Sequence, residues 1–382
     1  MNKIKLGEIC DILNGYAFKS EQYVDSGIRI IRIANVQKGF IEDNTPVFYP
    51  INSSGLEKYM LEEHDLLISL TGNVGRVALL QREMLPAAIN QRVACLRLNT
   101  DKIISSFLFH ILNSDYFEEQ CIQASNGVAQ KNMSTEWLKN YEIPLYSLEE
   151  QLKITSVLDG VRRVIKAKHE EVDKLDDLIK ARFVEMFGDV NTNEKNWAWK
   201  PLGELCTIVR GGSPRPIEQF LGGDIPWIKI GDATDGDSIY LTSTKEYIIQ
   251  EGVKKSRLVK AGSLIFANCG VSLGFARIIN FDGCIHDGWL AMEDIDGRLD
   301  KVFLLQALNQ MTEHFRAIAP AGTQPNLNTS IMKAYKQVIP PIELQRDFVE
   351  FTNHVDKSKV AIQKSLDETK LLFDSLMQEY FG

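Results

Sequence analysis

The chain has 382 residues, 44% of them hydrophobic and 25% charged, which is the composition of an ordinary globular protein. The length predicts two to three domains with a core each, and no run approaches 18 consecutive apolar residues, which excludes a membrane-spanning helix. The net charge of −8 disfavours nucleic-acid binding by the protein as a whole. However, Lys plus Arg against Asp plus Glu number 14 against 17 in residues 1–146 and 16 against 17 in 189–340, so a local basic surface remains possible.

The six cysteines show no CxxC spacing, and the first five residues contain no apolar signal core. Cys10 and Cys206 occupy equivalent places in a repeated pattern, which indicates small buried packing residues. We therefore expect free thiols and a reducing cytoplasm.

Residues 1–146 predict a first globular unit of mixed α/β structure. Short β-branched runs at 28–33, 66–70 and 93–98 are separated by turn residues and followed by a helix near 103–123. Asp65 with Glu62 and Glu63 precedes a strand, which is typical of a turn.

Residues 147–188 predict a long helix. Ser147 and Glu150 form a capping box, and Gly188 is a suitable stop. Between them, apolar residues recur in steps of four and three, which is the heptad pattern of a coiled coil. We call these positions the seam of the helix; two of them are occupied by charged residues, Lys168 and Arg182.

The second half of the chain repeats the first. The sequence Leu-Gly-Glu-Ile-Cys at 6–10 returns 196 residues later as Leu-Gly-Glu-Leu-Cys at 202–206. After an expected linker at 189–200, residues 189–340 predict a second mixed α/β unit with strands at 225–230 and 263–267 and a helix near 299–317. A unit of this size folds once, so the pattern indicates a tandem domain duplication and not a solenoid.

Residues 341–382 predict a second long helix whose seam is in the same phase as the first after a shift of 194 residues. Such seams are stable only when they are buried, and each helix is the obvious partner of the other. The fold class is therefore α+β, with two tandem mixed α/β domains separated by two long helices that form an antiparallel coiled coil.

The sequence contains no catalytic constellation. It has no phosphate loop, dinucleotide fingerprint, nucleophile elbow or zinc-protease motif, and its six histidines lack metal-ligand spacing. We expect no enzymatic activity, no metal and no cofactor in this chain.

Several polar loops are candidates for DNA contact, although tight turns and solvated loops explain them equally well. The Asn-Gln-Arg triplet at 90–92 offers side chains that pair with base edges. Its counterpart at 286–288 has a different sequence, which could result from base recognition or from neutral divergence of surface residues. Glycine-rich loops at 71–76 and 268–274 expose backbone amides. The candidate DNA-binding residues are Lys19, Arg76, Asn90, Gln91, Arg92, Lys131, Arg210, Ser213, Arg215, Lys229, Asn268 and His286. Ser134 and Asn328, which follow shared Gln-x-Asn motifs at 130–132 and 324–326, are expected helix caps.

This pattern resembles the specificity (S) subunit of type I restriction–modification systems. The resemblance covers the whole chain and is carried by the Leu-Gly-Glu opening of each unit (6–8, 202–204), Gly-Gly-Ser-Pro at 211–214 and Ile-Pro-Trp at 225–227. It also includes the Ile-Pro elements at 143–144 and 339–340 and the helix after each unit. The first unit departs from it, with Asn-Gly-Tyr-Ala-Phe-Lys at 14–19 in place of the Gly-Gly-Ser-Pro form.

The resemblance implies that 1–146 and 189–340 are target recognition domains, each reading one half of a split site in double-stranded DNA. It implies that the helices at 147–188 and 341–382 set the spacer. It also implies partners: two modification subunits that bind S-adenosylmethionine, and restriction subunits. The alternative is a two-domain structural adaptor that assembles partners through its coiled coil and binds no DNA.

Overall fold

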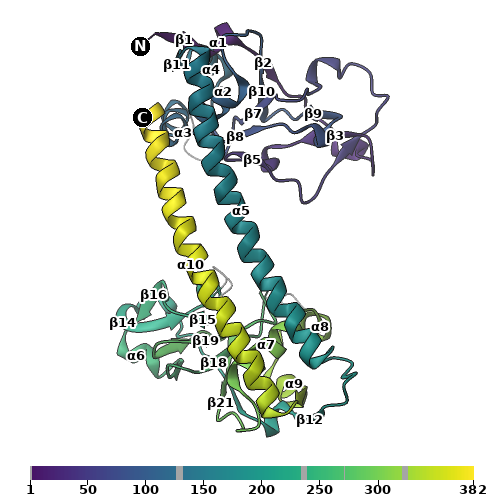
Figure 1. Cartoon of the computed structure of the whole chain (residues 1–382), viewed down its shortest axis with the longest axis vertical. Helices are drawn as coiled ribbons and strands as arrows, with labels where there is room; N and C mark the ends of the chain where they lie inside the picture. Colours follow the sequence, from purple (N-terminus) through teal and green to yellow (C-terminus); the bar gives the residue numbers. More distant parts are fainter. Residues whose placement is uncertain (1, 126–131, 234–238, 271, 321–325) are drawn as a thin grey trace. The chain divides into compact units, whose positions relative to one another are not determined.

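The structure is a computed structural model that describes residues 2–125, 132–233, 239–270, 272–320 and 326–382 (Figure 1). The chain forms two compact units. Unit 1 comprises residues 1–167 and 365–382, and unit 2 comprises residues 168–364. Each of the two long helices, α5 (Leu148–Phe187) and α10 (Ile342–Phe381), is divided between the units.

Unit 1 contains most of the elements of the first repeat. Its strands are β1 (Lys3–Lys5), β2 (Cys10–Asn14), β3 (Ile28–Ile31), β4 (Val36–Gln37), β5 (Phe40–Ile41), β6 (Phe48–Tyr49), β7 (Leu66–Ser69), β8 (Val77–Leu79), β9 (Ala87–Ile89), β10 (Val93–Leu98) and β11 (Glu142–Pro144). Its shorter helices are α1 (Leu6–Ile9), α2 (Ser105–Leu112), α3 (Asp115–Ala124) and α4 (Thr135–Asn140), with 3-10 turns η1 (Ser20–Gln22), η2 (Ile33–Asn35), η3 (Glu57–Tyr59) and η4 (Arg82–Met84).

Unit 2 contains the corresponding elements of the second repeat. Its strands are β12 (Ala198–Pro201), β13 (Thr207–Arg210), β14 (Leu221–Ile228), β15 (Tyr240–Leu241), β16 (Glu246–Ile248), β17 (Arg257–Val259), β18 (Leu264–Ala267), β19 (Ala276–Ile279), β20 (Gly283–Ile285), β21 (Trp289–Glu293) and β22 (Lys336–Ile339). Its shorter helices are α6 (Gln250–Val253), α7 (Lys301–Gln310), α8 (Thr312–Ile318) and α9 (Thr329–Ala334), with 3-10 turns η5 (Leu202–Glu204), η6 (Ile217–Gln219) and η7 (Ile230–Asp232).

The sheets repeat their strand order. The antiparallel sheet β2-β10-β7-β8 of unit 1 corresponds to β13-β21-β18-β19 of unit 2, where β15 extends it. The smaller sheet β6-β3-β9 corresponds to β16-β14-β20, with β17 added, and β1-β11 corresponds to β12-β22. The tandem duplication is thus confirmed at the level of topology.

The main sheet of each unit is covered on both faces. In β7, Leu66 and Ile68 belong to the cluster that packs against the helices, whereas Leu67 between them belongs to a second cluster with the smaller sheet. All three are fully buried. Because successive side chains of a strand point to opposite faces, a strand covered on both sides is a continuous apolar run.

The long helices form an antiparallel coiled coil. In unit 1 the beginning of α5 packs against the end of α10, and in unit 2 the end of α5 packs against the beginning of α10. Every predicted seam position is buried or half-buried in both helices. Charged residues occupy three of the seam positions, namely 168, 182 and 359. Lys359 pairs with Asp176, and the Arg182 guanidinium lies 5.8 Å from the Phe351 ring centre.

The ends of α5 follow the sequence signals. The Ser147 hydroxyl accepts a hydrogen bond from the Glu150 amide at 3.3 Å, and the Glu150 carboxylate accepts one from the Ser147 amide at 3.0 Å. Gly188 ends the helix with a φ of +74°, which glycine tolerates. The expected caps of α4 and α9 are also confirmed, since Ser134 and Asn328 accept hydrogen bonds from the Trp137 and Ile331 amides.

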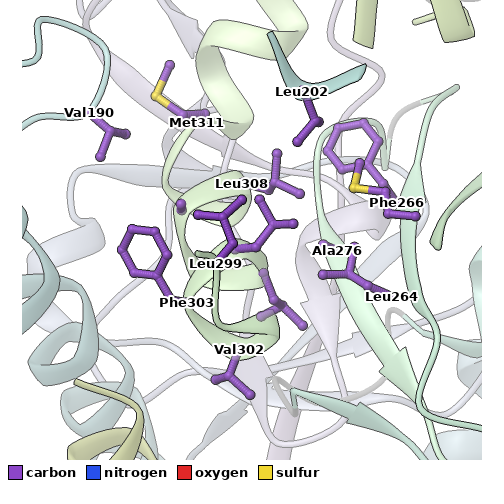
Figure 2. Close-up of a cluster of buried hydrophobic side chains, with 14 of the residues drawn as sticks. Val190, Leu202, Leu264, Phe266, Ala276, Leu299, Val302, Phe303, Leu308 and Met311 are labelled. Atoms are coloured by element: carbon purple, nitrogen blue, oxygen red, sulfur yellow. The ribbon is translucent and has the colours of Figure 1, made fainter. Parts of the chain in front are cut away.

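The core of unit 2 joins the helix pair to the sheet. Phe303 and Leu308 of α7 belong to one buried cluster with Leu264 and Phe266 of β18, and Figure 2 shows Phe303 on the side of α7 away from that strand. Phe303 also contacts Phe187 of α5, with ring centres 4.7 Å apart, and Phe187 lies 5.5 Å from Phe348 of α10. Burying one such ring stabilises the fold by about 1.5–3 kcal/mol.

Phe183 of α5 joins this group, with its ring centre 5.4 Å from that of Phe348. The positions of Phe303, Phe348, Phe183 and Phe187 recur in the core of unit 1 after a shift of 194 or 196 residues. They are occupied there by Phe107, Ile154, Met377 and Phe381, all in one buried cluster. The Phe107 and Phe381 ring centres lie 5.7 Å apart. The two units thus use one packing design with different side chains.

A buried glutamine fastens the first turn of each long helix to its unit. The Gln151 side chain accepts a hydrogen bond from the Ile104 amide at 2.9 Å and donates to the Lys102 and Tyr146 carbonyls at 2.8 and 3.0 Å. Gln345 of α10 makes the equivalent three bonds, to the Asp300 amide and to the carbonyls of Arg298 and Pro340. Both glutamines are 0% exposed.

Two expected elements differ from the sequence prediction. The helix expected near 103–123 is two helices, because Ser114 accepts a hydrogen bond from the Phe117 amide and starts α3; the counterpart near 299–317 is divided into α7 and α8. The stretch 189–200 is not a free linker. Val190 is buried in the core of unit 2, and the Trp197 indole donates to the Phe187 carbonyl at 2.9 Å.

Candidate nucleic-acid interface

Both units place a variable loop at the end of a parallel strand pair. In unit 1, β3 runs parallel to β9, and the Asn90 amide donates to the Ile31 carbonyl at 3.0 Å. In unit 2, β14 runs parallel to β20, and the His286 amide donates to the Ile228 carbonyl at 3.0 Å. The backbone is the same in both copies, while the triplets it carries, 90–92 and 286–288, differ.

A glycine brings a second loop against each triplet. A Cβ atom on Gly15 would lie 2.1 Å from the Asn90 carbonyl oxygen, and one on Gly211 would lie 2.1 Å from the His286 carbonyl oxygen. No side chain fits at that distance, so glycine is required at both places. The loops that follow, 16–19 and 212–216, therefore adjoin the triplets.

In unit 2 these two loops bring four of the candidate residues together around Asp287. The Asp287 carboxylate accepts a hydrogen bond from the Ser213 hydroxyl at 2.8 Å and lies 2.9 Å from His286 Nε2 and 3.6 Å from Arg215 Nη2. The Arg210 Nε atom donates to the Asp287 backbone carbonyl at 3.0 Å. We call Arg210, Ser213, Arg215, His286 and Asp287 the Asp287 cluster.

The protonation of the cluster follows from its contacts. His286 Nδ1 accepts a hydrogen bond from the Gly288 amide at 2.9 Å, so the proton of the neutral ring is on Nε2, which faces Asp287. Burial lowers the pKa of His286, and the nearby cations Lys229, Arg215 and Arg210 lower it further against the opposing effect of Asp287. Burial raises the pKa of Asp287, but the Ser213 hydrogen bond and the surrounding positive charges outweigh it and leave this pKa below its usual value.

A pocket of about 510 Å³ adjoins the cluster. Its lining includes Ser213, Arg215, His286 and the buried Trp227, whose ring centre lies 5.6 Å from that of His286. Lys229 is close by, since its Nζ lies 5.9 Å from the Trp227 ring centre, and it pairs with Glu246. This part of unit 2 combines cations with a hollow into which a base edge or a phosphate could enter.

Unit 1 presents a different surface at the equivalent place. Gln91 and Arg92 are exposed and Asn90 is half-buried, and Lys19 lies exposed on the adjoining loop. Aromatic side chains surround them: the Tyr16 ring centre lies 5.0 Å from that of Phe18 and 5.1 Å from that of Tyr59. Within the described part of the chain, the Lys19 and Arg92 side chains make no hydrogen bond or ion pair, so both are available to a ligand.

Three other candidates are placed differently. Asn268 is 0% exposed, and its amide donates to Asn326 Oδ1 and to the Leu327 carbonyl, both at 3.1 Å, so it holds a loop in the interior and offers no surface contact. Arg76 is half-buried and donates to Gln37. Lys131 lies outside the described residues.

Sequence reasoning missed Asp287 and Tyr16 as members of these surfaces. Asp287 was noted only as the counterpart of Gln91, because an acid in a DNA-binding loop is unexpected. The sequence does carry an arginine pair in the loop 210–216, but nothing in the sequence indicates that Asp287 contacts it.

The described residues contain neither a group of metal-binding side chains nor a membrane-spanning helix. In the described ranges, no three His, Cys, Asp or Glu side chains are grouped so that they could hold a metal ion. None of the helices in the same ranges is long and apolar enough to cross a membrane.

The expected turn at Glu62 is confirmed, because the Asp65 carboxylate accepts a hydrogen bond from the Glu62 amide at 2.7 Å and binds Arg97.

Comparison with known proteins identifies the family. The family model described as the type I restriction modification DNA specificity domain matches residues 1–176 and again residues 194–369. The chain therefore belongs to this family and carries two such domains.

Individual relatives agree with this assignment. The chain is 31% identical over 180 residues to the type I restriction enzyme MjaVIII specificity subunit of Methanocaldococcus jannaschii, a match that covers 45% of this chain and 42% of that protein. It is 36% identical over 161 residues to the EcoAI specificity subunit of Escherichia coli, covering 41% of this chain and 27% of that protein. These matches span less than half of the length of either relative.

A solved structure shares the fold. The type I restriction–modification S subunit from M. genitalium superposes with a TM-score of 0.55 at 16% identity, covering 100% of this chain and 96% of that one. At this identity the likeness is one of architecture, and it agrees with the two mixed α/β domains and the paired long helices.

Proposed function

We propose that this chain is the DNA-recognition subunit of a type I restriction–modification complex. Residues 1–146 and 189–340 are its target recognition domains, and each reads one half of a split site in double-stranded DNA. The helices at 147–188 and 341–382 set the spacer between the half-sites.

One observation carries this proposal: two copies of one backbone present different side chains at the same place. Asn90, Gln91 and Arg92 in unit 1 stand where unit 2 has His286, Asp287 and Gly288. A subunit that reads two different half-sites needs a constant scaffold and variable contact residues, because sequence is discriminated by contacts to base edges.

The contact residues divide by chemistry. Arginine pairs with guanine and asparagine or glutamine with adenine, so we assign base contacts to Asn90, Gln91, Arg92, Arg210, Arg215 and His286. Lysines and hydroxyls suit phosphates, so we assign backbone contacts to Lys19, Lys131, Lys229 and Ser213, and to Arg76 if it is released from Gln37.

The chain itself is proposed to be non-catalytic. Two modification subunits, which hold S-adenosylmethionine, and restriction subunits would supply the chemistry. The names of the relatives support this reading, since each is called the specificity subunit of a restriction enzyme. We place the complex in the cytoplasm, where it meets chromosomal DNA.

Methylome sequencing of a host with and without this gene tests the proposal. We expect one bipartite methylated motif to disappear when the gene is deleted and to return when it is restored. An unchanged methylome in the deleted strain, with the modification subunit still produced, would contradict the proposal.

A domain-exchange experiment tests whether each recognition domain reads its half-site independently. Residues 1–146 are replaced by the equivalent unit of another family member, and one half of the motif should change while the other half stays. A simultaneous change in both halves would show that the domains do not read independently.

A further inference from the structure

The Asp287 cluster contains a feature that DNA binding alone does not explain. A carboxylate that is 30% exposed lies among Arg210, Arg215, His286 and Lys229, on a surface proposed to meet a polyanion. A negative charge there repels the phosphates of any DNA, whatever its sequence. Its presence therefore calls for a function other than affinity.

The contacts of Asp287 show what it holds. Its carboxylate contacts the Ser213 hydroxyl, the His286 ring and the Arg215 guanidinium, and its backbone carbonyl accepts from Arg210. Arg215 is the farthest of these from the carboxylate, at 3.6 Å, and 82% of its side chain is exposed, so a ligand can reach it. Asp287 thus contacts Arg215 through its carboxylate and Arg210 through its backbone carbonyl.

We propose that Asp287 is a positioning residue that sets the sequence specificity of the second recognition domain. It withholds the cations of the Asp287 cluster from phosphates of unrelated DNA and presents them to bases of the cognate half-site. This inference rests on the proposed DNA-reading function of the domain.

Unrelated DNA and the cognate half-site offer different groups to Arg215. On unrelated DNA, Arg215 gains a phosphate contact only by giving up Asp287, while the carboxylate repels the same phosphate, so the net gain is small. On the cognate half-site, the two acceptor atoms of a guanine edge replace the carboxylate in a bidentate contact, and unrelated DNA places no guanine edge at this position. The carboxylate therefore lowers non-specific affinity more than specific affinity.

Unit 1 provides an internal comparison. Its counterpart of Asp287 is Gln91, which is uncharged and exposed, and its neighbours are the aromatic residues around Tyr16. The proposed device is therefore confined to the half-site read by unit 2, and the half-site read by unit 1 serves as a control within the same molecule.

The test uses the full chain with the variants Asp287→Asn and Asp287→Glu. Asp282→Asn is the matched control, because Asp282 is also ion-paired in unit 2, with Lys260 at 2.6 Å. The probes are a duplex with the methylome-derived motif, a shuffled duplex of the same length and composition, and duplexes with single base-pair changes in either half-site. Affinities are measured over a range of salt concentrations, after equal thermal stability of the variants has been verified.

For Asp287→Asn we expect affinity for the shuffled duplex to rise by about three- to tenfold at ~0.1 M salt, with a salt slope steeper by about one unit. The penalty for one base-pair change in the half-site of unit 2, normally about 5- to 150-fold, should fall toward one. Penalties in the half-site of unit 1 should not change. Asp287→Glu, which keeps the charge, and Asp282→Asn should both behave like the unaltered chain on the shuffled duplex.

Two results would overturn the inference while leaving the proposed function intact. An equal loss of affinity for the motif and the shuffled duplex in Asp287→Asn would show a merely structural role. A changed preference at one base pair without any gain on the shuffled duplex would show that Asp287 reads a base itself. Absence of any motif preference in the unaltered chain would instead refute the proposed function.

Discussion

The buried glutamine at the first turn of each long helix leads to a quantitative prediction. Replacing Gln151 by Ala removes three hydrogen bonds and leaves the Ile104 amide and the Lys102 and Tyr146 carbonyls without their partner in a fully buried place. Three bonds at about 0.5–1.5 kcal/mol each give a loss of about 1.5–4.5 kcal/mol. For a domain of roughly 150–250 residues this corresponds to a fall in Tm of roughly 3–18 °C.

The assay combines urea unfolding with amide hydrogen exchange. The exchange rate of the Ile104 amide should rise in Gln151→Ala, because its acceptor is lost, while amides of unit 2 keep their protection. Gln345→Ala should produce the same effect at the Asp300 amide in unit 2.

Gln123→Ala is the control, because Gln123 is exposed on α3 and its replacement should cost less than about 0.5 kcal/mol. If Gln151→Ala unfolds within 0.5 kcal/mol of this control, the buried amide does not fasten the helix and our reasoning is wrong.

Three further predictions concern pH, contact type and spacing. His110 is fully buried against Asp159, and burial lowers its pKa below the ordinary 6.5, so the unfolded chain binds the proton more tightly. The stability that the neutral His110 contributes is complete above pH 6.5 and is lost as the pH falls below that value. His110→Gln, which introduces the residue found at the equivalent position of α7, should therefore make the free energy of unfolding less dependent on pH in this range. An unchanged dependence on pH would refute this prediction. Arg92→Ala should relax preference at one base pair at a cost of roughly 1–3 kcal/mol, whereas Lys19→Ala should weaken binding to all sequences and lower the salt slope by about one; unchanged binding by both would show that we have chosen the wrong surface. Deleting one heptad from each helix, 162–168 with 356–362, should shorten the pair by about 10 Å and the DNA spacer by about three base pairs, and a surviving variant that methylates the original spacing would show that the helices do not set it.

Much of the architecture was predictable because its signals are local or periodic. The ends of α5 were found within one residue from Ser147, Glu150 and Gly188, which act through neighbouring backbone groups. Five strand runs are predicted from the sequence, and three of them, 66–70, 93–98 and 263–267, form β7, β10 and β18 of the main sheets. Both faces of these sheets are covered, which makes the runs continuous and apolar. Short strands such as β4 and β15 are not predicted. Because the sequence repeats, each element predicted in the first half of the chain also predicted its counterpart in the second half.

The remaining features depend on tertiary contacts. Asn268 follows a buried strand in a glycine-rich loop, a context that predicts exposure, yet its amide lies in the interior. The division between α2 and α3 is an exception, because it is set locally: the Ser114 hydroxyl caps α3 at the Phe117 amide, and the polar residues 113–115 are a signal that the prediction of a single helix overlooked. Asp287 could be placed only once the loop of Arg215 was seen to fold back over it, since the two residues are far apart in the chain.

The boundaries of the two compact units do not coincide with those of the sequence repeats. Phe183 and Phe187 belong to the first repeat but complete the core of unit 2, while Met377 and Phe381 belong to the second repeat but complete the core of unit 1. The two repeats have in effect exchanged helix ends, as partners do in a domain-swapped dimer, but within one chain. A mutation at Phe183 therefore acts as a destabilising change in unit 2, with a cost of about 3–5 kcal/mol for Phe→Ala. The loops of each repeat are free to diverge on their own, but each helix has to remain compatible with a core that the other repeat supplies, so the helices evolve under a shared constraint.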